Sequence, residues 1–524
     1  MTRLDTLTSW NADWAGLRVA VLGLGVTGFA VADTLVELGA RVRVLASGAD
    51  PERADLLDVI GAELVQKAEL VPSDLDGLEP ELIVVSPGFR PGHPILVWAE
   101  QQGIELWGDI ELAWRVRDKV RAAQWICVTG TNGKTTTVQL TTHLIAGSGA
   151  RVASVGNIGV PVLDAVREPT GFDVLVVELS SFQLHWINRN AAGALAPFAS
   201  VCLNLAEDHY DWHGSAAGYR DAKAKVYANT VVACVYNKAD VATMRMVEDA
   251  DVEEGCRAIG FDLGTPGPSD LGLVGDIVVD RAFAEARHAN ALELTTHGEL
   301  AEIGMAAPHS VSNVLAACAL ARAWGVQPEA VRAALATFRV DHHRSEPVAT
   351  IDGVLWVDDS KATNPHAADA SLTAFASVVW VVGGLLKGVD ISELVRRHGE
   401  RLRAAVVIGA ERSAVLAAFE RHAPTVPLFE VETAETSEVM REAVRLSAAA
   451  ASAGDTVLLA PAAASMDQFT DYGDRGRRFA AAVLEQAGGA GDDGPVDPQS
   501  PDLQSPGPES SGPESSGPAA QAGS

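Results

Sequence analysis

The stretch that most constrains the fold is residues 128–136, Val-Thr-Gly-Thr-Asn-Gly-Lys-Thr-Thr. The hydrophobic run 124–128 before it predicts a buried strand, and the amphipathic stretch 134–147 after it predicts a helix. A glycine turn between a strand and a helix N-terminus binds phosphate through backbone N–H groups and the helix dipole. Lys134 would add a positive charge, and the Thr135 hydroxyl could bind Mg²⁺.

The loop departs from the strict Walker pattern, because Val128 stands where that pattern has its first glycine. An ordinary strand–turn–helix corner is therefore an alternative. Packing alone explains Gly-Lys-Thr after a strand poorly, so the sequence favours a variant phosphate-binding loop.

The first segment begins with a second glycine motif, G-x-G-x-x-G at 23–28, between expected strands at 18–22 and 41–45. A dinucleotide site would need an acid after the second strand, but Ala46 and Ser47 stand there, which weakens a dehydrogenase interpretation. A third strand precedes Ser86-Pro-Gly. Farther on, a helix is expected to begin near Asp109, a plausible N-cap.

The middle segment carries polar residues where expected strands end. The run 173–178 ends on Glu178, a position suited to holding Mg²⁺ at the crevice of a parallel sheet. Another strand, 199–204, delivers the acid- and histidine-rich cluster 207–213. Asn157 follows a further strand, as a turn residue or a ligand contact. A helix is expected over 219–227, on which Lys223 and Lys225 would by themselves be a solvated face.

Three motif matches in this segment are rejected. Asn237-Lys-Ala-Asp240 and Asp211-Trp-His-Gly214 match two GTPase motifs, but the interval between them is too short for the intervening GTPase elements. His209 and His213 have the spacing of a zinc-protease pair but lack its glutamate.

Strands and helices also alternate through the third segment, and each strand ends in a polar or glycine-rich loop. The predicted fold class is α/β with three domains: a Rossmann-like N-terminal domain, a central P-loop-type mononucleotide-binding domain and a Rossmann-like C-terminal domain. The expected bounds are 1–120, 121–340 and 341–487, followed by a disordered Gly/Pro/Ser/acidic tail at 488–524.

Charge and composition restrict the partners. The net charge of −29 makes nucleic acid an unlikely partner, although a nucleotide can still bind through local N–H groups and lysines. The five cysteines include no C-x-x-C pair, which favours reduced core cysteines in a cytoplasmic protein. Without a leader-like N-terminus or a long apolar run, no membrane insertion is expected.

In combination, these motifs resemble those of the Mur ligases, cytoplasmic enzymes that build the peptidoglycan stem peptide. The resemblance spans about residues 15–485. The motifs that carry it are Gly130-Thr-Asn-Gly-Lys-Thr135, Glu178-Leu-Ser-Ser-Phe-Gln-Leu184, Asn204 with Glu207-Asp-His209, Tyr219-Arg-Asp-Ala-Lys223 and Asp359-Ser-Lys-Ala-Thr-Asn364. It implies a monomeric ATP-dependent ligase that adds D-glutamate to UDP-N-acetylmuramoyl-L-alanine through an acyl phosphate.

The resemblance also implies roles for individual residues, with Lys134, His209 and Lys223 as the catalytic ones. The residues implied for ATP are Gly130, Thr131, Asn132, Gly133, Lys134, Thr135, Thr136, Asn313, Arg344 and Asp359. Those implied for two Mg²⁺ ions are Thr135, Glu178, His209 and Lys223, the last as a carbamylated lysine. Those implied for the UDP-sugar are Val26, Thr27, Ser86 and Asn157. Those implied for D-glutamate are Lys361, Thr363, Lys387, Ser465 and Tyr472.

The chain departs from the family pattern at three places: Ala46 near the uridine, Ser310 near the adenine, and Tyr472 where phenylalanine is common. Two alternatives remain open. One is another amide ligase of this architecture, such as the folylpolyglutamate or diaminopimelate-adding type. The other is a non-catalytic nucleotide-sugar-binding protein, which would leave Glu178, His209 and Lys223 without a role.

Overall fold

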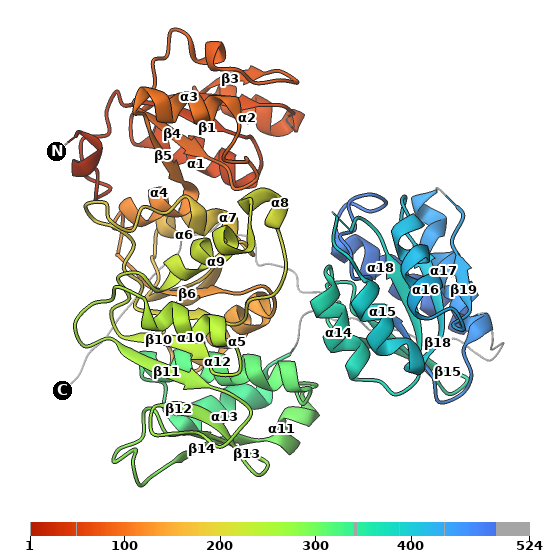
Figure 1. The fold of residues 1–524 in the computed structure, drawn as a ribbon. Helices are drawn as coiled ribbons and strands as arrows, with labels where there is room; N and C mark the ends of the chain where they lie inside the picture. The colour runs from red at the N-terminus through yellow and green to blue at the C-terminus, as the bar shows by residue number, and fades with distance from the viewer. Residues whose placement is uncertain (1, 49, 340–342, 387, 434, 489–524) are drawn as a thin grey trace, which may run out of the picture.

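The computed structural model describes residues 2–48, 50–339, 343–386, 388–433 and 435–488. Its strands form three sheets of five, nine and six strands, one in each of three lobes that follow one another along the chain (Figure 1). The predicted three-domain α/β fold class is therefore confirmed. The expected tail, apart from Gly488, and Lys387 lie outside the described residues.

The first sheet has the strand order β3-β2-β1-β4-β5, and all of its pairs are parallel. Parallel strands joined by helices place their connecting loops at one edge, where ligands bind in open α/β sheets. The strands are β1 (Arg18–Leu22), β2 (Arg41–Ala46), β3 (Glu63–Gln66), β4 (Leu82–Val85) and β5 (Glu105–Gly108). The helices are α1 (Val26–Glu37), α2 (Pro51–Ile60) and α3 (Pro94–Gln102).

Helix α4 (Asp109–Arg115) leads toward the central domain and corrects one prediction. Gly108 occupies the N-cap position, and a Cβ there would lie 3.1 Å from Cβ of Trp186, so a larger residue would be crowded. Asp109 is instead the first helical residue, and its buried carboxylate accepts a hydrogen bond from Gln183 at 3.0 Å. The N-cap assignment was wrong because the chain enters the helix one residue earlier.

The central sheet has the order β14-β13-β12-β11-β10-β9-β6-β8-β7. Its strands are β6 (Gln124–Thr129), β7 (Val152–Gly156), β8 (Val174–Glu178), β9 (Ala199–Cys202), β10 (Ala233–Asn237), β11 (Arg257–Phe261), β12 (Asp270–Val274), β13 (Ile277–Asp280) and β14 (Leu292–Thr296). Its helices are α5 (Lys134–Ala146), α6 (Val162–Arg167), α7 (Ser181–His185), α8 (Tyr210–His213), α9 (Ala216–Ala224), α10 (Val241–Glu248), α11 (His297–Glu302), α12 (Pro308–Trp324) and α13 (Pro328–Thr337).

Strands β9, β6, β8 and β7 are adjacent and parallel, so the segments that follow them meet at one edge of the sheet. The nucleotide loop follows β6, Glu178 ends β8, Asn157 follows β7, and the stretch leading to His209 follows β9. The antiparallel extension β12–β14 at the far edge was not expected from the sequence.

The third sheet has the order β15-β16-β20-β17-β18-β19, parallel except for the edge pair β15–β16. Its strands are β15 (Glu346–Ile351), β16 (Val354–Asp358), β17 (Val378–Gly383), β18 (Leu402–Ile408), β19 (Leu428–Glu430) and β20 (Thr456–Leu459). Its helices are α14 (Pro365–Thr373), α15 (Ser392–His398), α16 (Ser413–His422), α17 (Thr436–Ala450) and α18 (Tyr472–Gly488).

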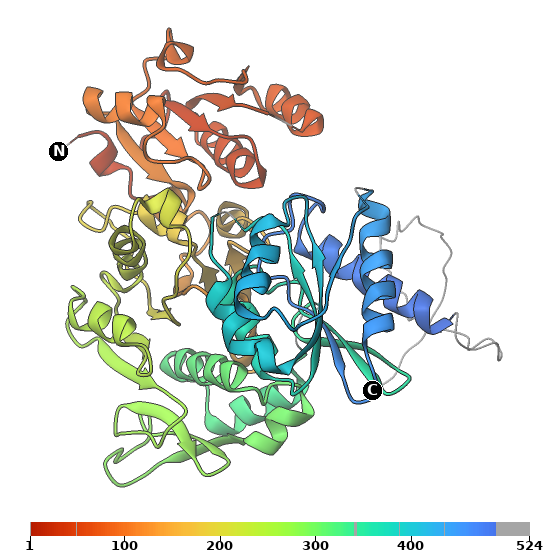
Figure 2. The same cartoon turned by 45° about the vertical axis from the view of Figure 1, so that its right-hand side comes forward.

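The three domains differ in how they are joined. The first two share one hydrophobic core, in which Val21 of the first sheet belongs with Trp125 and Leu175 of the central one. The third domain has its own cores on the two faces of its sheet. Figure 2 shows it turned in front of the central domain. The predicted domain boundaries stay predictions. Among the described residues, no helix is both long and apolar enough to span a membrane.

Trp380 of β17 offers a test of the third core. Its buried indole packs against Phe419 and donates to the Ala460 carbonyl at 2.7 Å, at the end of β20. We expect Trp380→Ala to lower the free energy of unfolding of this domain by about 3–5 kcal/mol, because it leaves a cavity and an unpaired carbonyl. Denaturant unfolding measures this. Leu484→Ala, at a site 57% exposed, is the control and should change stability by no more than about 0.5 kcal/mol. Equal losses in the two variants would contradict the prediction.

Candidate active site

The nucleotide loop is held in place from strand β9. Asn204, just beyond that strand, accepts hydrogen bonds from the backbone N–H of Thr131 at 3.0 Å and of Asn132 at 2.9 Å. Its side-chain amide donates to the Asn132 carbonyl at 3.1 Å. This pairing fixes the loop between two neighbouring strands.

Two glycines shape the loop. Gly130 has φ +150° and Gly133 has φ +81°, conformations that other residues rarely adopt. A Cβ on Gly133 would lie 2.3 Å from Oδ1 of Asn313 in helix α12. The side chain of Asn313, implied for the adenine side, therefore lies directly against the start of α5.

Lys134 and Lys223 converge on one carbonyl. The Gly130 oxygen accepts from Nζ of Lys134 at 3.0 Å and from Nζ of Lys223 at 2.8 Å. Burial lowers the pKa of both amines. The charge of Lys134 lowers the pKa of Lys223 further, to about 7. Two ammonium groups on one oxygen repel each other, so the site favours an anionic partner or a neutral Lys223.

The interpretation of Lys223 and Lys225 as a solvated face was wrong for both. Lys223 is 2% exposed, with its amine over the Tyr219 ring. Lys225 is half-buried and donates to the Ile187 carbonyl at 2.9 Å. The expected helix 219–227 is α9, which begins at Ala216, followed by a 3-10 turn, Lys225–Tyr227; this packing carries both lysines inward.

Glu178 has the features of a metal ligand. It is 2% exposed, and its Oε1 accepts from the Asn157 side chain at 2.9 Å. Its Oε2 is buried and has no hydrogen-bond partner among the described residues. A buried carboxylate oxygen without a donor is costly unless a cation binds it. Thr135, the second residue of α5, offers a hydroxyl at the same edge of the sheet.

His209 is held in an uncommon backbone conformation at the start of α8, with φ +54°. Its ring packs against Phe182 with the centroids 4.6 Å apart, and its Nε2 lies 3.4 Å from Asp208. Asp208 also interacts electrostatically with both Lys134 and Lys223. The acid- and histidine-rich cluster therefore adjoins the lysine pair.

The rejected motif residues have structural partners. Asn237 donates to the Leu203 carbonyl, and Asp240 caps α10 and accepts from the Leu205 N–H, so both support the segment after β9. Asp211 pairs with Arg90, and His213 bonds to the Ser181 hydroxyl at 3.0 Å.

In the third domain, three of the implied D-glutamate residues, Lys361, Thr363 and Ser465, lie in loops beyond strand ends, and Tyr472 begins α18. Nζ of Lys361 lies 3.7 Å from the centre of the Tyr472 ring. Thr363 follows Lys361 in the loop after β16, and the buried Ser465 lies in the loop after β20.

Asp359, implied for ATP, is buried and accepts a short hydrogen bond from Ser371. Burial raises the pKa of this carboxyl to about 6, and Arg344 counteracts the rise. Arg344 also lowers the pKa of Lys134, so it interacts with both the nucleotide loop and the third domain.

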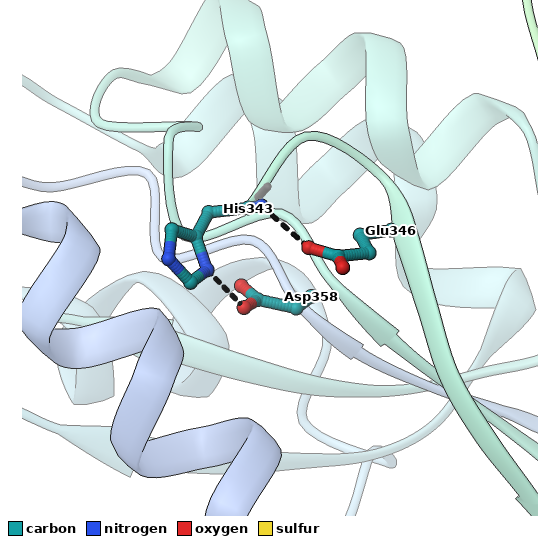
Figure 3. A group of neighbouring side chains, drawn as sticks. All are labelled: His343, Glu346 and Asp358. Carbon is teal, nitrogen blue, oxygen red and sulfur yellow. Dashed lines mark hydrogen bonds and ion pairs between the residues drawn. The ribbon is translucent and has the colours of Figure 1, made fainter. Parts of the chain in front are cut away.

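The entry into the third domain is fixed by His343, Glu346 and Asp358 (Figure 3). Nδ1 of His343 lies 2.6 Å from Asp358, and the His343 backbone N–H donates to Glu346 at 2.8 Å. Although the three could offer atoms to a cation, the hydrogen bond to Asp358 raises the pKa of His343 and favours imidazolium. The three residues are therefore better explained as an ion pair, next to Arg344 in the chain, than as a metal site.

The residues implied for the UDP-sugar fall into two places. The exposed Val26 and the half-buried Thr27 and Ser86 lie around the first glycine turn. A Cβ on Gly23 would lie 2.8 Å from the Ser86 hydroxyl. Asn157 instead lies in the central domain, where its side chain donates a hydrogen bond to Glu178.

Asn204, Asp208 and Tyr219 lie near the phosphate loop, and the sequence places them within motifs but predicts no individual role for them. Tyr219 bonds to the Thr131 hydroxyl at 3.0 Å through its own hydroxyl. Asn204 and Asp208 lie within expected motifs. Their position just beyond a buried strand is the sequence feature that could have identified them as functional.

A glycine loop at a helix N-terminus, with two lysines and a buried carboxylate beside it, defines a three-domain enzyme of the phosphate-binding α/β class. Family models match the chain over its length. They are the Mur ligase MurD-like N-terminal domain over residues 17–108, the Mur ligase middle domain over 128–321, and the Mur ligase glutamate ligase domain over 343–463. The chain belongs to the Mur ligase family.

Curated relatives cover nearly the whole chain. A UDP-N-acetylmuramoylalanine–D-glutamate ligase of Leifsonia xyli subsp. xyli is 65% identical, over 94% of this chain and 97% of its own. One of Streptomyces avermitilis is 50% identical, over 90% and 98%. Among solved structures, the UDP-N-acetylmuramate-alanine ligase MurC of Thermotoga maritima is similar with a TM-score of 0.53 at 19% identity. It covers 90% of this chain and 100% of its own, and supports the fold.

Gly133→Ala tests the packing of the loop against Asn313. We expect the variant to bind ATP at least about tenfold more weakly, since a Cβ clashes with Asn313 and strains a positive φ. Calorimetric titration with nucleotide measures this. Gly149→Ala, beyond the other end of α5, is the matched control, because it has φ +87° and open space. If both variants bind ATP like the wild type, the contact does not matter.

Proposed function

We propose that this chain is an ATP-dependent ligase that joins D-glutamate to UDP-N-acetylmuramoyl-L-alanine and works as a monomer in the cytoplasm. The observation that carries the proposal is the convergence of Lys134, Lys223 and Glu178 at the phosphate loop. The activity of the Leifsonia xyli relative, which is 65% identical, agrees with it.

The reaction has two steps. The substrate carboxylate attacks the γ-phosphorus of ATP, giving an acyl phosphate and ADP. The amine of D-glutamate then attacks the acyl carbon, and phosphate leaves as the amide forms. Lys134 would neutralise charge on the β- and γ-phosphates while the loop N–H groups orient them. Lys361, Thr363, Lys387, Ser465 and Tyr472 would hold D-glutamate in the third domain.

The donor set fits Mg²⁺, which prefers oxygen ligands. The unpaired Oε2 of Glu178 and the Thr135 hydroxyl would hold one ion, and His209 with a carbamylated Lys223 would serve a second. When bound, the ions would withdraw charge from the phosphates. The remaining work of these residues is to hold the loop and place the reacting groups.

Burial supports carbamylation of Lys223. Adding CO₂ to the neutral amine forms an N–C bond and releases one proton, and a carbamate anion replaces the ammonium. An anion at this position would remove the repulsion with Lys134 and supply oxygen ligands. A pKa lowered to about 7 leaves much of the amine neutral near that pH; below it the amine protonates and carbamylation weakens.

Lys134→Ala should lower D-glutamate-dependent phosphate release by at least about 100-fold, since it removes the cation from the transferring phosphates. A coupled phosphate assay with the UDP-sugar, D-glutamate and ATP measures this. Lys119→Ala, a half-buried lysine outside the site, is the control and should stay near wild type. Full phosphate release by Lys134→Ala would refute the assignment.

Acceptor choice separates this activity from other amide ligases. We expect D-glutamate to support phosphate release at least about 100-fold better than L-glutamate or diaminopimelate. L-glutamate has the same groups in the opposite configuration, and diaminopimelate has a longer chain with a second amine. An amino-acid panel assayed with the same UDP-sugar measures this. A preference for another acceptor would identify a different ligase, and sugar binding without ATP turnover would indicate a sensor.

CO₂ dependence tests the modified lysine. Removing CO₂ and bicarbonate should lower turnover, and adding bicarbonate should restore it, with weaker restoration below about pH 7. NMR with isotope-labelled bicarbonate should show a carbamate signal that Lys223→Arg abolishes. Turnover independent of CO₂, with no such signal, would contradict carbamylation while leaving the ligase activity standing.

A further inference from the structure

The third domain contacts the tip of the nucleotide loop through a cluster of side chains. None of these side chains has been given a catalytic role above. Asn364 donates through Nδ2 to Oδ1 of Asn132 at 3.0 Å, and Nδ2 of Asn132 lies 3.0 Å from Nδ1 of His366. Asn364 and His366 both lie at the start of helix α14, on the side of the third domain that faces the central domain (Figure 1).

The orientation of these groups follows from one backbone N–H. Ala367 donates its backbone N–H to Oδ1 of Asn364 at 2.9 Å, which makes the Asn364 side chain the N-cap of α14. The other end of that amide must then be Nδ2, a donor, so the Asn132 atom that it meets is Oδ1, an acceptor. Asn132 consequently turns its own Nδ2 toward His366.

An amide nitrogen can only donate, so Nδ1 of His366 must accept. An imidazole accepts at Nδ1 only when it is neutral and carries its proton on Nε2. Protonation of Nδ1 would place two donors against each other and remove the hydrogen bond. His366 is also exposed, so solvent protons reach it without unfolding.

We propose that His366 is a positioning residue that, through Asn132, holds the third domain on the nucleotide loop, and that only its neutral, Nε2-protonated form does so. The proposal rests on the proposed function, because the third domain supplies the D-glutamate residues that must reach the loop. Acid pH then loosens the contact between the two substrate sites.

The charged groups around His366 agree with this dependence. His309, near the start of α12 in the central domain, interacts electrostatically with His366 across the contact. The pKa of His309 is lowered mainly by desolvation and, to a smaller extent, by His366. If both imidazoles were protonated they would repel each other, so acid pH opposes the contact from both domains. On α14 itself, the acid Asp369 is paired with Arg397 and His398.

Three proteins test the proposal: the full-length wild type, His366→Asn and His366→Ala. Asparagine places an acceptor oxygen near the position of Nδ1 and does not titrate, whereas alanine has no acceptor. The measurements are KM and kcat for ATP and D-glutamate between about pH 5 and 8, where histidine changes charge. Small-angle X-ray scattering with a non-hydrolysable ATP analogue reports whether the third domain closes.

We expect KM for D-glutamate in the wild type to rise as pH falls through this range, by about fivefold for one hydrogen bond. His366→Asn should keep the low KM for D-glutamate, and its KM should rise less than that of the wild type as pH falls. His366→Ala should have the raised KM at every pH, with kcat nearly unchanged, and should compact less with nucleotide.

An unchanged acid rise in His366→Asn, or a wild-type KM and compaction in His366→Ala, would overturn the proposal. Scattering needs no turnover, so it separates this failure from failure of the proposed function. A wild type that closes normally on nucleotide but releases no D-glutamate-dependent phosphate would refute the ligase activity alone.

Discussion

The repulsion between two buried lysine amines is the constraint on which the site depends. Lys134 and Lys223 reach the same carbonyl, that of Gly130, within a loop that Asn204 fixes from the neighbouring strand. Lys134 also donates to the Thr131 carbonyl at 2.8 Å, and Lys223 is 2% exposed, so both amines are held against the loop. Their charges must therefore be met from outside, by phosphates, or from within, by a change in Lys223 itself. Glu178 presents the complementary problem, a buried carboxylate oxygen for which the described part of the chain supplies no donor. A nucleotide with its cations would satisfy both.

The fold makes this meeting possible by placing four parallel strand ends side by side. Each supplies one kind of group: the loop from β6, a carboxylate from β8, an amide after β7 and a histidine after β9. The first domain shares its core with this sheet, whereas the third has separate cores and meets the loop through polar side chains. A polar contact is suited to being made and broken during a reaction cycle.

The parts of the site that are local in the sequence could be predicted. Glycine, lysine and threonine in a fixed order identify the loop, and the alternation of strands and helices identifies the three α/β domains that the structure confirms. Residues whose roles arise from packing could not. Lysines on a helix are usually solvated, and only the docking of α9 on the loop buries Lys223. The start of α9 was missed because the polar, glycine-containing stretch around Ser215 resembles a loop until that residue caps the helix. Asn204 acts across two strands that lie far apart in the chain. The contact of Asn132 with His366 joins residues separated by 234 positions, which no local pattern encodes.

The most direct test is a structure of the chain with the UDP-sugar and an ATP analogue, at a resolution that shows the end of the Lys223 side chain. Phosphates against Lys134, and planar density continuous with Nζ of Lys223 beside a cation, are the predicted result. An unmodified Lys223 with the nucleotide bound away from the Gly130 loop would contradict the proposed site.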